Sequence, residues 1–165
     1  MDIRADFNAT LLLNKALENK LNTIVQTLQF VGERFVVNVR TKINADPAYR
    51  AAMRAISVRP KVPITEKTPR YADDTGNLTA SVGYKILVDG KDVMTGGFTG
   101  DAIGSATGQA AVRSIASRFP KGIILIVVAG MQYAAAVESL GYDVLTGSSF
   151  IAERELTEAL RGLTK

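Results

Sequence analysis

The chain has 165 residues, 47% of them hydrophobic and 22% charged, and its formal net charge at pH 7 is +4. A chain of this length and apolar content can form one domain with a hydrophobic core, and its composition is not that of a disordered protein. It contains neither Cys nor His, which excludes disulfides, thiolate nucleophiles, His/Cys zinc sites and His-dependent catalytic triads.

The first predicted element is one long helix over residues 10–45. Its apolar side chains recur at alternating steps of four and three residues, the spacing of one helix face; they are Leu17, Leu21, Ile24, Leu28, Val31 and Phe35. A helix this long has more surface than a small domain can cover. We favour a core-packing helix, and the alternative is that part of it faces a neighbouring subunit.

The residues after this helix are interrupted by proline. Asp46-Pro47 is typical of a helix start, so a short helix is expected over residues 47–55. Three prolines then predict an extended edge segment or loop over residues 56–71.

The same region is strongly basic. Eight basic and two acidic residues lie between Arg40 and Arg70, a net charge of +6. Such a surface could contact DNA phosphates without reading bases, or an acidic neighbouring protein. It lacks the interleaved aromatic residues of single-strand binders. The residues that we expect to face a DNA channel or a partner are Arg50, Arg54, Arg59 and Lys61.

A one-turn helix and a hairpin are predicted next. Asp73, Asp74 and Thr75 can cap a helical turn over residues 76–80. Alternating apolar residues predict a strand over 82–88, and Asp89-Gly90 predicts a tight turn into a returning strand. Gly, Ser and Thr dominate the stretch that follows.

That stretch, residues 96–108, is predicted to be a flexible surface loop. It lacks the Gly-Lys-Ser/Thr ending of a phosphate-binding loop. A short helix is expected over 109–118. The uninterrupted apolar run over 123–128 predicts a strand buried on both faces and therefore central in its sheet.

Two further helices are expected, over residues 132–140 and 150–163, the last capped by Ser148 or Ser149. The order of elements predicts a single α+β domain over residues 1–165. It would combine a long N-terminal helix, a small, mostly antiparallel sheet and two or three further helices packed on it.

No catalytic, cofactor-binding or metal site is expected. The serines have no His to activate them, and no Asp/Glu cluster has the spacing of a calcium loop. The longest apolar run, over residues 123–129, is too short to span a bilayer, and the N-terminus does not resemble a signal peptide. We therefore expect synthesis in a reducing cytosol and no membrane partner.

Three segments together resemble a known family. Residues 75–82, Thr-Gly-Asn-Leu-Thr-Ala-Ser-Val, resemble the TGxLxxSI element of bacteriophage tail-completion proteins. These are head–tail joining, or minor tail, proteins of long-tailed phages. Residues 133–141 resemble that family's YAxxVExG element, and residues 150–156 its closing PFLxPAL helix. Their order and approximate spacing agree with the family, as does the long first helix.

The resemblance implies a structural virion protein without cofactors. It would form a homo-oligomeric ring at the phage neck or tail top, as a completion, stopper or tail-terminator layer. Its partners would be the head connector and the tail-tube proteins, and it would surround the DNA path.

The motif residues are expected to act structurally, through packing and capping. Their positions are Thr75, Gly76, Leu78, Ser81, Tyr133, Val137 and Glu138. Thr75 would cap, Gly76 would permit a tight turn, and Leu78 would enter the core. Tyr133 and Val137 lie one turn apart and would pack together. Glu138 could pair with a basic residue of the same or a neighbouring subunit.

Two other functional hypotheses remain beside the virion protein. The first is a host- or plasmid-encoded nucleic-acid-binding protein that makes non-specific phosphate contacts through the basic segment. The second, and weaker, is a small enzyme with a carboxylate or Ser/Lys site, because the absence of His and Cys removes the commonest catalytic groups. The oligomeric state should separate the virion protein from the nucleic-acid-binding protein.

Overall fold

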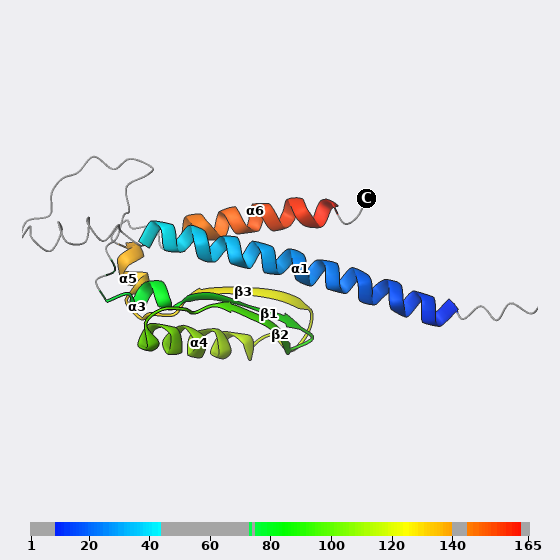
Figure 1. The fold of residues 1–165 in the computed structure, drawn as a ribbon, viewed down its shortest axis with the longest axis horizontal. Coiled ribbons are helices and arrows are strands. Elements are labelled where there is room, and N and C mark those ends of the chain that lie inside the picture. Colours follow the sequence, from blue (N-terminus) through cyan, green and yellow to red (C-terminus); the bar gives the residue numbers. More distant parts are fainter. Residues whose placement is uncertain (1–8, 44–72, 74, 140–144, 163–165) are drawn as a thin grey trace, which may run out of the picture.

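The computed structural model describes residues 9–43, 73, 75–139 and 145–162 of the chain. They form an α+β fold in which a three-stranded antiparallel sheet lies between helices (Figure 1). Helices α1 (Ala9–Ile43) and α6 (Thr146–Gly162) cover one face of the sheet, and α4 (Ala102–Ala116) covers the other. The fold class predicted from the sequence is confirmed.

The sheet has the strand order β2-β1-β3. Its strands are β1 (Val82–Val88), β2 (Lys91–Gly97) and β3 (Ile123–Ala129), all antiparallel to their neighbours. Asp89 and Gly90 both have positive φ, which is the backbone of the tight hairpin turn that Asp-Gly predicts. The predicted hairpin is confirmed.

Among the described residues, the strand predicted to be buried and central is a partly exposed edge strand. Residues 123–129 do form a strand, but β1 pairs on both sides and β3 pairs only with β1 in this part of the chain. The α4 side of β3 is buried, through Ile126 and Val128. On the other side Ile123 is 40% exposed and Leu125 and Val127 are partly buried. The predicted burial of both faces and the central position are therefore both wrong, because an apolar run does not determine which elements cover a strand or pair with its edges.

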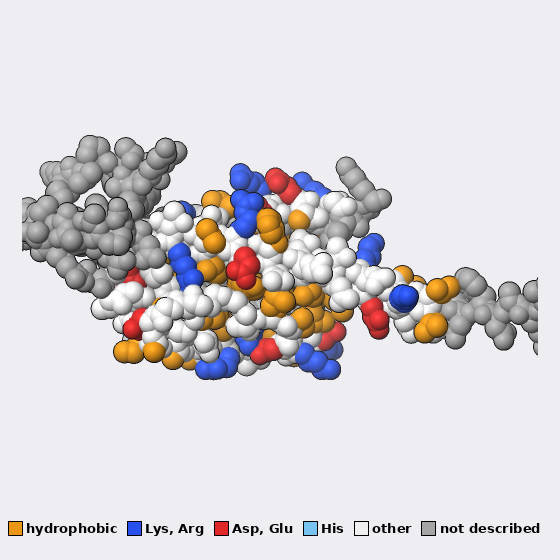
Figure 2. Space-filling model, viewed as in Figure 1, with side chains coloured by type: hydrophobic (Ala, Val, Ile, Leu, Met, Phe, Trp, Pro, Cys, Tyr) orange, Lys and Arg blue, Asp and Glu red, His pale blue; other side chains and the backbone are white. Residues whose placement is uncertain are grey.

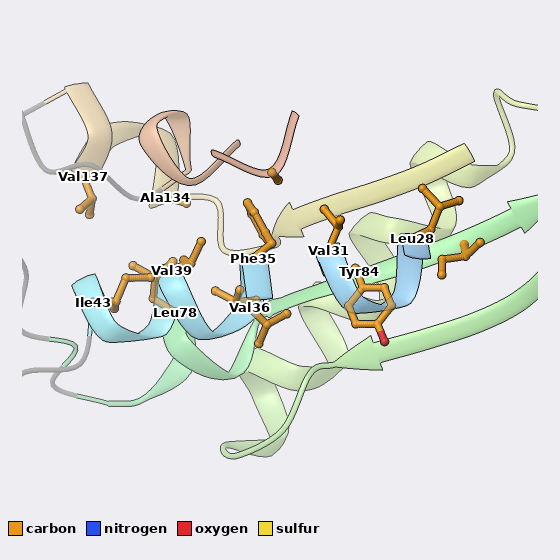
Figure 3. Packing of buried hydrophobic residues seen from close by; sticks show 13 residues of the cluster. Leu28, Val31, Phe35, Val36, Val39, Ile43, Leu78, Tyr84, Ala134 and Val137 are labelled. Carbon is orange, nitrogen blue, oxygen red and sulfur yellow. The ribbon is translucent and has the colours of Figure 1, made fainter. Parts of the chain in front are cut away.

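The main core lies between α1 and the sheet (Figure 3). Leu28, Val31 and Phe35 from α1 meet Tyr84 and Ile86 from β1 there. The long helix predicted over residues 10–45 is confirmed, with bounds of 9 and 43. The apolar spacing identified it correctly because one face of its C-terminal half faces the core.

A second core lies between the sheet and α4, and it corrects the predicted loop. Residues 96–108 were expected to be a loop, yet residues up to Gly97 belong to β2 and α4 starts at Ala102. Phe98 is buried, and its ring lies where a Cβ on Gly83 or Gly108 would be. The glycines therefore leave room for the Phe98 ring, and they allow α4 to lie close to the part of the chain on which it packs.

The remaining elements are short or extend the predicted ones. Helix α3 (Asn77–Ala80) confirms the one-turn helix, and α5 (Ala134–Ser139) is shorter than predicted. Helix α6 begins four residues earlier than expected, so Ser148 and Ser149 lie within it and do not cap it. The helix predicted over 47–55 and the extended segment over 56–71 lie outside the described residues.

Candidate interaction surfaces

The first motif segment forms a tightly capped turn at one end of the sheet. The Asp73 carboxylate accepts hydrogen bonds from the backbone N–H groups of Gly76 (3.1 Å) and Thr79 (2.6 Å). The Thr75 hydroxyl accepts one from Asn77 (3.2 Å). Gly76 has φ of 76°, which a residue with a Cβ rarely adopts. The expected roles of Thr75 and Gly76 agree with this geometry, and Asp73 carries most of the cap.

The first motif segment is tied through its backbone to the residues that precede the second. Leu78 and Ser81 are both fully buried, and the Ser81 hydroxyl donates to the Leu78 carbonyl (2.8 Å). The Ser81 carbonyl in turn accepts from the N–H of Gly130 (3.2 Å), three residues before the second segment. A Cβ on Gly130 would lie 2.4 Å from the Cα of Gly108, so the chain at Gly130 can lie this close to α4 only because Gly130 has no side chain.

The second segment leads into the start of α6. Val137 is buried in the main core, and Tyr133 is partly buried against the same cluster, as their predicted packing requires. Among the described residues the Glu138 carboxylate contacts Thr146, and its pairing with a basic residue of the same or a neighbouring subunit stays a prediction. Its Oε1 accepts from the backbone N–H of Thr146 (2.8 Å) and from the Thr146 hydroxyl. A carboxylate at a helix N-terminus is stabilised by the free N–H groups and the helix dipole.

Arg40, near the C-terminus of α1, forms hydrogen bonds with α3, with the first residue of β1 and with a residue just after β2. Its guanidinium donates to the carbonyl of Thr79 (3.2 Å, from Nε) and to the hydroxyl of Thr99 (2.9 Å, from Nη1). It also donates to the carbonyls of Val82 and Thr99, both at 3.4 Å. Burial lowers the pKa of Arg40, and the nearby Glu33 carboxylate acts in the opposite direction. Arg40 was counted with the basic segment, but its guanidinium is engaged within the fold.

Tyr84 joins β1 to the middle of α1. A Cβ on Gly32 or on Gly96 would lie 2.7 Å or 2.4 Å from the Tyr84 ring, so the ring packs between two glycines. Its hydroxyl donates to Oε1 of Glu33 (2.7 Å). Burial raises the pKa of Tyr84, and the hydrogen bond to Glu33 raises it further. The sequence predicted Tyr84 only as a strand residue, because Gly32 and Glu33 are far away along the chain.

A groove lies between α1, β3 and α6. It has a volume of about 460 Å³. Its lining is apolar except for a serine and a glutamate: Ile24, Leu28, Ile123, Leu125, Val127, Ser149, Ala152, Glu153, Leu156 and Leu160. An ion pair between Arg34 and Glu155 (2.9 Å) links α1 to α6, and the Arg34 guanidinium lies over the ring of Phe30. Sequence periodicity predicted the apolar faces but not that they would leave a groove between them.

The residues predicted to face DNA or a partner lie outside the described residues. These are Arg50, Arg54, Arg59 and Lys61. In the described part of the chain, no three acidic side chains gather closely enough to hold a metal ion. No helix there is both long enough and apolar enough to cross a bilayer.

The motif residues thus build one end of the molecule and present no catalytic constellation among the described residues. Each is buried, caps a helix or sets a backbone turn. Comparisons of the chain with protein-family models, with curated proteins and with solved structures found no match.

Proposed function

We propose that this chain is a structural virion protein that forms a ring at the neck or tail top of a long-tailed phage. In that role it joins the head connector to the tail tube, encircles the DNA path and needs no cofactor. Its place of action is the virion, after synthesis in the host cytoplasm. The motif resemblance is the origin of the proposal, and the arrangement of the motif segments supports it.

The observation that carries the proposal is the arrangement of the first two motif segments next to the start of the helix that holds the third. The elements α3, α5 and the start of α6 lie at the same end of the molecule, and the third segment follows within α6 (Figure 1). The Ser81–Gly130 hydrogen bond joins the first segment to the residues just before the second, and the Glu138–Thr146 bond joins the second to the residues just before the third. Motif residues that fix the structure of one end of the fold are what we expect of a protein that acts through its shape.

The surface also favours assembly over chemistry. Large apolar side chains are exposed together near the N-terminus of α1, among them Leu12, Leu13 and Leu17. Exposed apolar side chains that gather on one surface commonly mark contacts between proteins. Figure 2 shows such side chains at the protruding end of α1 and over the sheet below it.

The alternative function is non-specific binding of nucleic acid through the basic segment. It rests on residues outside the described part of the chain. Among the described residues of that segment, the partly buried Arg40 donates hydrogen bonds to Thr79 and Thr99 of its own chain, which holds its guanidinium against the fold. We therefore place DNA contact second, as a property that a ring around the DNA path could also have.

Deletion of the gene from the phage genome that carries it tests the proposal. We expect DNA-filled heads and separate tails, or tails of faulty length, in lysates viewed by electron microscopy. Supply of the wild-type gene from a plasmid should restore joined particles. Infectious, fully joined virions made without this protein would contradict the proposal.

A further inference from the structure

Helix α1 extends well beyond the rest of the fold. Its 35 residues span about 52 Å at 1.5 Å per residue, whereas a seven-residue strand spans about 23 Å. All residues from Thr10 to Lys20 are exposed. In Figure 1 this N-terminal half projects past the end of the sheet and of α6.

The projecting half continues the apolar face that the core uses. Leu28 is 4% exposed, and Leu21, two turns towards the N-terminus, is partly buried. Leu17 is then 58% and Leu13 60% exposed. Steps of four residues keep these side chains on one helix face. We call Leu13, Leu17 and Leu21 the open seam, since it is the uncovered continuation of a buried surface.

The groove between α1, β3 and α6 is the matching feature on the same molecule. Its lining is almost entirely apolar, and it includes residues of α1, such as Ile24, and residues of α6, such as Leu156. Recognition of a helix by a groove uses apolar anchors spaced by three, four or seven residues, and the open seam has that spacing. Glu153 lines the groove, and Lys20 flanks the seam, only about 20° around the helix from Leu13. The charges on the two surfaces are therefore complementary.

We infer that the open seam of one copy docks in the groove of a second copy of this chain. The inference rests on the proposed ring function and supplies the contact by which the ring forms. Every copy carries both surfaces, so a seam-to-groove contact made in one direction is heterologous and can repeat from copy to copy until the assembly closes. Docking covers the exposed leucines and the exposed apolar residues of the groove, Ile123 and Leu160.

Complementary variants test the contact. Leu17→Asp places a charge on the seam, and Leu160→Asp, at a position 37% exposed, places one in the groove. Leu12→Asp is the matched control, because Leu12 is 50% exposed at the same end of α1 but points about 100° away from Leu13. Thermal melting monitored by circular dichroism establishes that each variant folds, since all three positions are exposed.

Sedimentation velocity over a range of concentrations gives the result. We expect an oligomer for the wild type and Leu12→Asp, and at least tenfold weaker association for Leu17→Asp and Leu160→Asp. An equimolar mixture of those two should recover a heterodimer, because the intact seam of one fits the intact groove of the other.

A monomeric wild type, or Leu17→Asp and Leu160→Asp that assemble like the control, would overturn the inference. A mixture that remains monomeric would also overturn it. These outcomes are separate from those of gene deletion: separate heads and tails after deletion, together with intact assembly of the variants, would retain the proposed function and reject this contact.

Discussion

Gly108→Ala distinguishes a packed helix from the flexible loop that composition predicts over residues 96–108. Gly108 lies in the middle of α4. In a helix with open space beside it, replacement of Gly by Ala stabilises by about 1 kcal/mol through helix propensity. In an exposed loop the change would have little effect.

The packing around Gly108 reverses that sign. A Cβ there would lie 2.4 Å from the carbonyl oxygen of Ser81 and 2.7 Å from the ring of Phe98. Because the oxygen belongs to the backbone, relief requires a shift of α4 and not a new side-chain rotamer. Overpacking costs about 1–3 kcal/mol, and a 2.4 Å clash with a backbone atom belongs in the upper part of that range, at about 2–3 kcal/mol. After subtraction of the propensity gain, we expect a net loss of about 1–2 kcal/mol.

Chemical denaturation and thermal melting measure this loss. For a chain of this size, 1 kcal/mol corresponds to about 2–4 °C in Tm, so Gly108→Ala should melt about 2–8 °C below the wild type. Gly162→Ala is the control, because no atom lies within 4 Å of a Cβ at that helix position, and its stability should change by less than about 1 kcal/mol. A Gly108→Ala protein as stable as the wild type would refute the packing of α4 against Ser81 and Phe98.

Three further predictions concern the core, a buried phenol and the basic segment. Leu28→Ala should lower the free energy of unfolding by about 2–5 kcal/mol, since Leu28 is buried in the main core; a normal denaturation midpoint would contradict that burial. Tyr84→Phe should cost about 1 kcal/mol below pH 10, where the Tyr84–Glu33 hydrogen bond is intact. In the wild type the raised pKa of Tyr84 means that the folded protein keeps the phenol proton above pH 10, where the unfolded chain releases it. The wild type should therefore lose stability as pH rises past about 10, more steeply than Tyr84→Phe, and parallel pH profiles would contradict this. DNA binding measured by fluorescence anisotropy should be weak, independent of sequence and steeply dependent on salt. Joint replacement by alanine should flatten that dependence, and tight sequence-selective binding would instead favour a nucleic-acid-binding protein; the residues to replace are Arg50, Arg54, Arg59 and Lys61.

The sequence by itself determined the elements whose pattern is local. The four-and-three spacing from Leu17 to Phe35 predicted α1 to within two residues at each end. Alternation over residues 82–88 and the Asp89-Gly90 turn predicted β1 and its hairpin. These features depend on side-chain period and backbone preference, which neighbouring residues in the chain already express.

Tertiary structure decided the features that depend on distant residues. An apolar run over residues 123–129 is the same whether the strand is central or at an edge, because the elements that pack on its faces and pair with its edges come from elsewhere in the chain. Glycine spacing in α4 looked like loop composition, since the ring of Phe98 and the carbonyl of Ser81 that require those glycines come from other elements. Glu138 accepts a hydrogen bond at the start of α6, because folding places the backbone N–H of Thr146 at its carboxylate. The groove beside α1 is likewise formed by three separate elements, and the periodicity of any one of them does not predict the space between them.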